Sequence, residues 1–222
     1  MNMSINRNET AVPRSPQENQ RIKDERRRQI MDAALKVFAE KGLAATMMSD
    51  IAAASDLSYG LIYHYFHDKE ELFITLVERA LQGALRLTEE VRARPGSPWE
   101  RLQILCAEMV EGARATPEYF RIIVRAQLGE SPSSAVHTLV NRYGNGIQDN
   151  IATLIREGQE AGQVAAGDPN ELAYLLNAIV QGLTLNLTTY PDITDEFPSA
   201  EIVMRFLRPE LRVSTEEHPH AD

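Results

Sequence analysis

Apolar residues recur at helical spacing along most of the chain. Within residues 26–42, Ile30, Ala34 and Phe38 fall on one face of a helix, and Gly42 is placed to end it. No segment shows the strict alternation of apolar and polar residues that is typical of a half-buried strand. The pattern therefore predicts an all-α fold of about nine helices.

Capping residues indicate where the later helices begin. Ser, Thr and Asp at N-cap positions, followed in several cases by proline at the first helical position, are the usual start signals. They predict helix starts after Thr46, Ser58, Asp68, Ser97, Thr116 and Asp168, and apolar spacing adds a long helix over about 134–161 and a last one over about 199–207. The polar segments 1–20 and 213–222 contain too few apolar residues to pack, and we expect them to be disordered.

The stretch Leu57–Phe73 departs from an ordinary amphipathic pattern. With Ile62 pointing to the core, Phe66 lies on the same side, and the outer face carries Gly60 and His64 in place of Glu, Lys or Arg. Glycine inside a helix costs about 1 kcal/mol relative to alanine, so this face suits close approach of another backbone. Because the preceding helix ends only a few residues earlier, the pattern favours a helix-turn-helix that presents its second helix to the major groove.

The composition is that of an ordinary globular chain with an uneven charge distribution. The 222 residues are 43% hydrophobic and 25% charged, with a formal net charge of −9. Residues 21–41 contain seven Lys/Arg against four Asp/Glu, whereas residues 76–222 contain 13 Arg and no Lys against 21 Asp/Glu. A basic entry segment thus precedes an acidic body. No run of about 18 apolar residues is present to span a bilayer, and the N-terminus is unlike a signal peptide, so we expect a cytoplasmic protein without a membrane partner.

A specific resemblance covers about a quarter of the chain. Residues 27–77 resemble the N-terminal DNA-binding domain of the tetracycline-repressor (TetR) family. The matching motifs are F-x-E-K-G at 38–42, T-x-x-x-D-I-A at 46–52, L-S-x-G-x-I-Y-x-Y-F at 57–66 and K-E-E-L at 69–72. The resemblance implies a homodimeric regulator of transcription, usually a repressor, that binds an operator in double-stranded DNA and responds to a small molecule of unknown identity.

The resemblance also implies domains and DNA contacts. Residues 21–68 would form the DNA-binding domain, with the helix-turn-helix at 47–66, and residues 69–212 the helical effector-binding and dimerisation domain. The implied DNA contacts are Thr46, Met47, Met48, Ser49, Ser58, Tyr59, Gly60, Leu61, Tyr63, His64, Tyr65 and Lys69. Two positions depart from the family pattern: Leu61 replaces a small polar residue and can meet only a thymine methyl group, and Tyr59 replaces a frequent lysine.

The acidic body contains an unusually apolar segment, residues 171–190. A helix that is apolar almost all round needs partners on several sides. Its polar stripe can lie in a dimer seam, face solvent or line part of a ligand cavity, and consists of Tyr174, Asn177, Gln181, Thr184 and Thr188. The resemblance places helices 170–188 and 199–207 in a four-helix dimer interface, to which we assign Ala178, Gly182, Leu183, Leu185, Val203 and Phe206.

The middle helices supply the other candidates for an effector cavity. Added to the polar stripe, they are Trp99, Met109, Tyr119, Phe120, Arg125 and Tyr143, and each is also suited to ordinary packing. The main alternative is a constitutive DNA-binding dimer whose helical body serves dimerisation only.

Enzyme chemistry has no support in the sequence. There is no glycine-rich phosphate loop, no nucleophile elbow and no histidine pair at metal spacing within a helix. The single cysteine, Cys106, lies in an apolar run and excludes an intrachain disulfide, while His218 and His220 lie in the polar tail. We therefore expect no catalysis, no cofactor and no metal site. A helical enzyme fused to a degenerate DNA reader would need acid and base residues that the sequence does not bring together.

Overall fold

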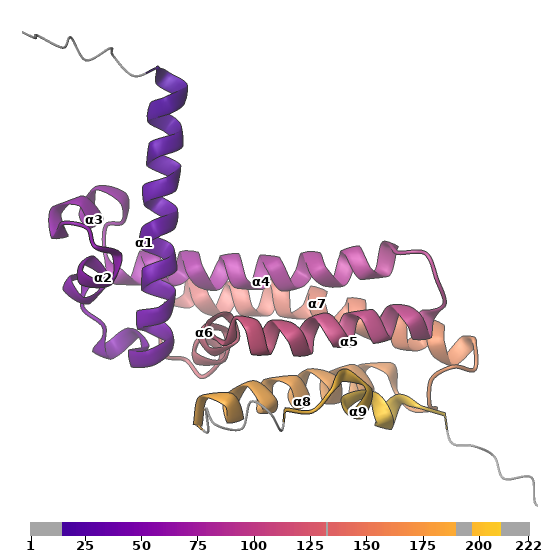
Figure 1. Ribbon diagram of the computed structural model, residues 1–222. Coiled ribbons are helices and arrows are strands. Elements are labelled where there is room, and N and C mark those ends of the chain that lie inside the picture. Colours follow the sequence, from indigo (N-terminus) through magenta and orange to yellow (C-terminus); the bar gives the residue numbers. More distant parts are fainter. Residues whose placement is uncertain (1–14, 132, 190–196, 210–222) are drawn as a thin grey trace, which may run out of the picture.

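The computed structural model describes residues 15–131, 133–189 and 197–209, and these residues form nine α-helices and one 3-10 turn, with no strand (Figure 1). The expected all-α fold is confirmed. The elements are α1 (Pro16–Ala45), α2 (Met48–Ser55), α3 (Tyr59–Tyr65), α4 (Lys69–Ala93), α5 (Pro98–Ala115), α6 (Pro117–Gln127), α7 (Ser134–Glu160), α8 (Pro169–Thr189), α9 (Ala200–Val203) and η2 (Met204–Leu207). None of these helices is long and apolar enough to cross a bilayer.

The first three helices pack around one end of α4. Phe38 of α1 meets Phe73 of α4 edge to face, with ring centroids 5.4 Å apart, and Ile62 of α3 is fully buried beside them. The same core takes in Ile122 of α6. The apolar core is therefore continuous from the helix-turn-helix into the body, and α4 and α6 belong to both.

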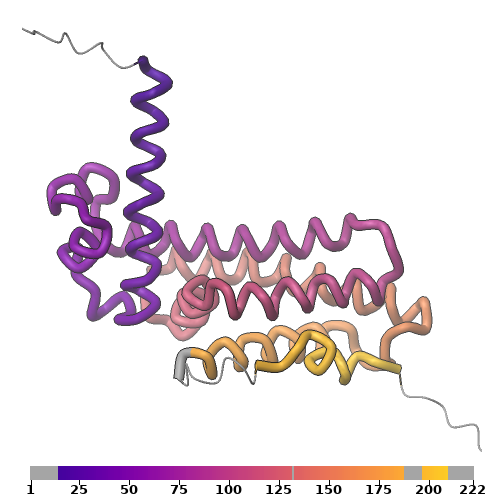
Figure 2. Tube along the Cα trace, in the orientation of Figure 1, coloured from indigo at the N-terminus to yellow at the C-terminus, as the bar shows by residue number. Residues whose placement is uncertain are grey.

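The body is built from helices that run alongside one another, with α4, α5, α7 and α8 forming most of its length (Figure 1, Figure 2). Its own core lies farther from the helix-turn-helix and includes Leu105, Ile151 and Leu176. Cys106 is buried in this core, and burial raises the pKa of its thiol to about 11, so it stays an uncharged packing residue.

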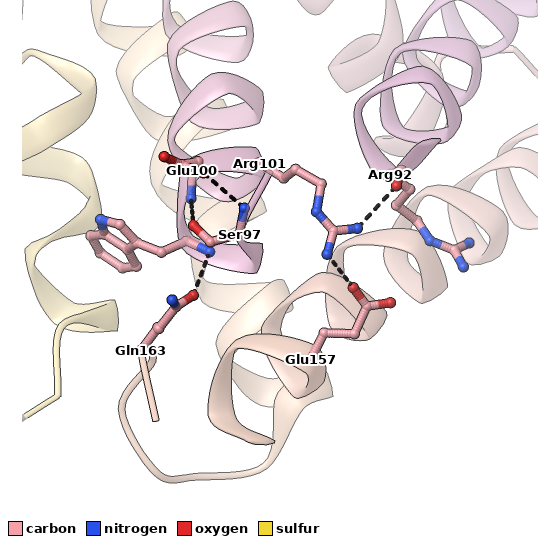
Figure 3. Close-up of polar contacts among 7 residues, drawn as sticks. Arg92, Ser97, Glu100, Arg101, Glu157 and Gln163 are labelled. Atoms are coloured by element: carbon pink, nitrogen blue, oxygen red, sulfur yellow. Dashed lines mark hydrogen bonds and ion pairs between the residues drawn. The ribbon is translucent and has the colours of Figure 1, made fainter. Parts of the chain in front are cut away.

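Polar side chains fix the far corner of the body, where α4 turns into α5 (Figure 3). Glu100 accepts a hydrogen bond from the backbone N–H of Ser97 at 2.8 Å, which lowers the pKa of its carboxyl group. Arg101 donates to the Glu157 carboxylate of α7 at 2.7 Å and to the Arg92 carbonyl of α4 at 3.0 Å. The helix start predicted after Ser97 is confirmed, and Ser97 and Glu100 form a capping box there. The corner holds α4, α5 and α7 in a fixed relation.

Several predicted helix ends are wrong. Helix α1 begins at Pro16 rather than near Arg21, because the Ser15 hydroxyl caps it by accepting from the Glu18 N–H at 3.1 Å. Residues 16–20, predicted to be disordered, are therefore helical. Residues 1–14 and 210–222, with His218 and His220, lie outside the described part of the chain.

Two predicted caps also need correction. Met47, not Thr46, is the N-cap residue of α2, and its N–H donates to the Asp50 carboxylate at 2.9 Å. Ser58 does stand at the N-cap of α3, but its side chain makes no capping bond. The Gly42 backbone, at φ 77°, ends the regular part of α1 as predicted, although a last turn continues to Ala45.

Candidate nucleic-acid interface and ligand cavity

The outer face of α3 carries two tyrosines, a glycine and a histidine. Tyr59 and Tyr63 are exposed and pair with each other, with hydroxyl oxygens 3.1 Å and ring centroids 5.0 Å apart. The hydrogen bond between the two hydroxyl groups raises the pKa of Tyr63, so this hydroxyl stays protonated. A protonated tyrosine hydroxyl at this exposed position is the kind of group that contacts phosphate oxygens. His64 is also exposed, and its ring packs edge to face against half-buried Tyr65.

Gly60 has no structural reason to lack a side chain. A Cβ atom added there would meet nothing within 4 Å, and the residue lies in the first turn of a regular helix. Packing within the chain therefore does not account for a residue that weakens the helix by about 1 kcal/mol. Close approach of an external partner to the helix backbone does account for it.

The start of α2 places only half of its predicted contacts at the surface. Met47 and Ser49 are exposed, but Thr46 and Met48 are buried, with 0% and 6% of their surfaces accessible. The Thr46 hydroxyl donates to the Gly42 carbonyl at 2.6 Å. The side chains of Thr46 and Met48 are therefore packing residues and not DNA contacts. Met48 faces the core at the start of α2, and Thr46, which precedes the helix, is held inward by its bond to the Gly42 carbonyl.

Lys69 does not extend a free charge toward a phosphate. Its ammonium group donates to the carbonyl oxygens of Leu43 at 2.8 Å, Ala44 at 3.1 Å and Thr46 at 2.8 Å. An ammonium group has three N–H donors, and all three are engaged. The predicted phosphate contact is thus corrected to a clamp that holds the connection between α1 and α2 against the start of α4.

Two further predicted contacts lie at the edges of this surface. Leu61 is half-buried between the core and solvent, and Ser58 is exposed just before α3. The exposed members of the predicted set are Met47, Ser49, Ser58, Tyr59, Gly60, Tyr63 and His64. These residues lie at the start of α2, just before α3 and on α3, and we call the surface that they form the α3 face.

A cavity of about 540 Å³ lies within the body, among α4, α5, α6, α7 and α8. Six of the nine predicted effector-binding residues line it: Met109, Tyr119, Phe120, Tyr174, Asn177 and Gln181. Ala178, which we assigned to the dimer interface, also lines it. The remaining walls are mainly apolar side chains with a few charged groups, as in small-molecule sites generally.

Three predicted cavity residues have structural roles instead. Trp99 contributes its backbone N–H to the Gln163 side chain at 3.2 Å, near the far corner of the body (Figure 3). The Tyr143 hydroxyl receives a hydrogen bond from Gln82 at 3.0 Å and thereby ties α7 to α4. Arg125 points out of the cavity toward α1.

Sequence reasoning missed the wall that α4 contributes. This wall includes Gly83 and Ala84, and because glycine and alanine are small they leave room beside the middle of a long helix. It also includes the charged residues Arg79 and Arg86. Glu108 of α5 also lines the cavity. The small pair at 83–84 is the signal that could have identified this wall from the sequence.

Arg125 joins the cavity wall to the helix-turn-helix domain. It pairs with Glu130 and donates to the carbonyl oxygens of Ala39 at 3.3 Å and Glu40 at 3.4 Å, near the end of α1. The Glu130 carboxylate in turn accepts from the Leu43 N–H at 3.3 Å. Since Phe120 and Val124 of α6 line the cavity, one short helix touches both the cavity and the end of α1.

The outer side of α8 leaves apolar and small residues exposed. Leu175, Ala178, Gly182 and Leu185 recur at spacings of three and four residues and are accessible, with Leu185 56% exposed. A Cβ atom added at Gly182 would meet nothing of its own chain within 4 Å. We call these four residues the α8 face.

The other predicted interface residues lie deeper. Val203 is only 5% exposed and packs in the body core, so its assignment to an interface is wrong. Leu183 and Phe206 are half-buried against the same core. On α9 it is Ile202, not predicted, that is exposed.

Comparisons with known proteins agree with this architecture. Residues 30–76 match the family of bacterial regulatory proteins of the tetR type, and residues 98–212 match the C-terminal domain of BetI-type transcriptional repressors. The transcriptional repressor KstR of Mycolicibacterium smegmatis is 24% identical over 200 residues, which span 88% of this chain and 90% of that protein.

Solved structures show the same fold at low identity. The fatty acid degradation regulator FadR from Bacillus halodurans superposes with a TM-score of 0.69 at 22% identity, covering 90% of this chain and 99% of that one. A transcriptional regulator from Saccharomonospora viridis in complex with choline gives a TM-score of 0.63 at 24% identity, covering 81% and 92%. The chain belongs to the TetR family of DNA-binding transcriptional regulators and is not an enzyme.

Proposed function

We propose that this protein is a homodimeric repressor that leaves its operator when a small molecule occupies the body cavity. The observation that carries the proposal is the cavity of about 540 Å³ whose α4 and α6 walls also belong to the core of the DNA-binding domain. A ligand that changes the positions of these helices changes the position of α3 as well. A body that served dimerisation alone would have no use for such a cavity.

The α3 face is the proposed reader of the operator. The Tyr63 hydroxyl donates to a phosphate, Tyr59 and His64 meet base edges, and the DNA backbone approaches α3 at Gly60. The α8 face is the proposed dimer contact, because it leaves exposed apolar and small residues where a second copy can pack. A symmetric dimer presents two α3 helices and so requires an operator with two inverted half-sites.

Gly60→Ala tests the docking of α3. Within the chain the added methyl group is accommodated, so the variant should be more stable, by up to about 1 kcal/mol, because alanine is the better helix former. Operator binding should nevertheless weaken by about tenfold or more, since a displaced base contact is worth about 1–3 kcal/mol. Thermal melting and fluorescence anisotropy with a labelled operator duplex measure the two effects.

The control is Asn145→Ala, an exposed position on α7 that does not line the cavity and where alanine is also the better helix former. It should gain stability and keep its operator affinity. Unchanged operator affinity in Gly60→Ala would show that α3 does not dock on DNA through this face.

The cavity indicates the chemical class of effector. Its walls are mainly apolar, and Glu108 and Arg86 have no hydrogen-bond or ion-pair partner among the described residues. A lipophilic molecule with one polar or charged group fits this arrangement. The Saccharomonospora viridis regulator binds choline and the Bacillus halodurans regulator governs fatty acid degradation, so choline and decanoic acid are suitable first probes.

The experiment that tests the proposal has two steps. An operator is first selected from a pool of random duplexes by the purified protein, and each probe is then titrated into the protein–operator complex. Release by one probe, together with a rise in the melting temperature of the free protein, supports a ligand-responsive repressor. Tight operator binding that choline, decanoic acid and a wider library of lipophilic compounds all leave unchanged would favour the constitutive dimer.

A further inference from the structure

The first half of α1 stands away from the rest of the molecule. In Figure 1 and Figure 2 the helix rises past α2 and α3 and continues beyond them without a neighbour. From Pro16 to Arg28 every residue is exposed except Ile22, which is half-buried. Isolated helices of this length are marginal in water, and this one has no apolar face to pack against the protein. Its stability within the chain rests on the Ser15 cap and on continuity with the packed half of α1.

Two contacts show which side of this extension faces the helix-turn-helix. The Gln29 amide donates to the Ser55 carbonyl at the end of α2 at 2.7 Å, and the Arg27 guanidinium lies over the Phe66 ring, 4.8 Å from its centroid, at the end of α3. At about 100° per residue, Lys23 and Arg26 fall between these two directions. The extension therefore presents two cations on the side of α2 and α3.

Acidic residues avoid that side. At the same helical spacing, Asp24 and Glu25 point away from the helix-turn-helix, together with Arg21 and Arg28. Glu18 falls at the edge of that side, beside the Gln29 direction, and its carboxylate pairs with Arg21 at 3.8 Å. Neither Lys23 nor Arg26 is paired with a carboxylate among the described residues, since Arg26 donates only to the neutral Gln29 amide, at 2.7 Å. The face is thus positively charged in a protein whose formal net charge is −9.

The direction of the extension determines what it can reach. Helices α8 and α9 lie on the side of the body opposite to the N-terminal start of α1 (Figure 1). In a dimer formed through α8, each α1 extension points away from the twofold axis. The 13 residues from Pro16 to Arg28 measure about 20 Å at 1.5 Å per residue, which corresponds to roughly six base pairs.

We propose that the α1 extension binds phosphates of the operator duplex outside each half-site, through Lys23 and Arg26, and so lengthens the footprint of the dimer. The inference rests on the proposed function, because the DNA must first be held by α3. Charge complementarity indicates the binding partner. An unpaired basic face beside a DNA-reading helix fits the phosphate backbone of the duplex, and such phosphate contacts carry no sequence information.

The test compares two duplexes that contain the selected operator. One ends at the outer boundaries of the two half-sites, and the other carries ten further base pairs of arbitrary sequence on each side. The test variant is the double substitution Lys23→Glu with Arg26→Glu. The control is Arg21→Glu with Arg28→Glu, which changes the net charge equally on the same helix but on the opposite side. It also breaks the exposed Arg21–Glu18 ion pair, so its helix content is compared with that of the wild type.

The wild-type protein should bind the longer duplex at least tenfold more tightly at low salt. The test variant should lose this advantage, and its dependence of log K on log salt should become shallower by about 0.9 for each phosphate that it no longer neutralises. The control variant should keep most of the advantage. Circular dichroism of each variant reports whether α1 stays helical.

The outcomes separate this inference from the proposed function. Equal wild-type affinity for the two duplexes, or an equal loss in the test and control variants, would overturn the inference and leave operator binding intact. Binding to neither duplex would overturn the proposed function and the inference with it.

Discussion

Gly182→Arg is expected to abolish the dimer without unfolding the chain. A Cβ atom added at exposed position 182 meets nothing of its own protomer within 4 Å, so the arginine side chain can start there without a clash and extend into solvent in the monomer. In the proposed dimer the same guanidinium is driven into a seam of Leu175, Ala178 and Leu185. An uncompensated buried charge costs about 3–5 kcal/mol, which corresponds to a rise of roughly 100-fold or more in the dimer dissociation constant.

Sedimentation equilibrium measures the dissociation constant, and operator binding should fall with it because one half-site alone holds the protein weakly. Ala93→Arg is the matched control, since Ala93 is exposed at the far end of α4 and takes on the same side chain without meeting α8. If the Gly182→Arg protein remains a dimer at the concentrations at which the wild-type protein is a dimer, the interface lies elsewhere. Leu183→Asp is a poorer test, because half-buried Leu183 packs in the body core and its loss would also destabilise the monomer.

Periodicity alone predicted the orientation of α3. With Ile62 and Phe66 inward, Gly60, Tyr63 and His64 had to be outward, and the burial of each residue agrees. The same argument turns Met48 inward at the start of α2, and its burial agrees. We placed Thr46 and Met48 on the DNA side because the resemblance to the family was carried over position by position. Thr46 precedes the helix, so periodicity does not orient it, and only the tertiary fold shows its bond to the Gly42 carbonyl.

Lys69 shows what a local signal leaves out. The resemblance implied a DNA contact, and a phosphate partner also suits a cation in the first turn of a helix, which the helix dipole disfavours. The partners are three carbonyl groups more than 20 residues earlier in the chain, where α1 ends around Gly42. Only the tertiary fold brings these carbonyls beside α4, so a sequence pattern cannot distinguish the two kinds of acceptor.

The cavity was predicted in part for a similar reason. Aromatic and polar residues such as Phe120 and Asn177 attract attention in a sequence, and these two line the cavity. The volume itself arises where side chains are small, at Gly83 and Ala84, and small residues carry little signal in an apolar helix. Trp99 and Tyr143 were plausible by type, but their positions on the helices direct them elsewhere.

Arg125→Ala is expected to leave effector binding intact while removing much of its effect on operator binding. Arg125 does not line the cavity, so the affinity of the free protein for a releasing probe should not change. Its bonds to the Ala39 and Glu40 carbonyls hold α6 to the end of α1. Without them, a shift of α6 around a bound ligand is transmitted to the DNA-binding domain only through α4 and the shared apolar core.

The measured quantity is the coupling between the two ligands. A coupling of about 1–3 kcal/mol makes the probe weaken operator binding by about 5- to 150-fold, and linkage requires that operator weaken probe binding by the same factor. Calorimetric titration of the probe into free protein and into the protein–operator complex gives this factor for the wild type and for Arg125→Ala. The factor should fall toward one in the variant.

Tyr143→Phe provides the control for this prediction, because it removes the hydrogen bond from Gln82, which joins α7 to α4 away from α1, and it should preserve the coupling. If the coupling factor of Arg125→Ala equals that of the wild-type protein, transmission runs through α4 and the shared apolar core instead. In that core, Phe73 of α4 packs against Phe38 of α1 at a ring separation of 5.4 Å. Because the Phe38–Phe73 contact is present in both proteins, the difference between their coupling factors isolates the contribution of the polar link from α6.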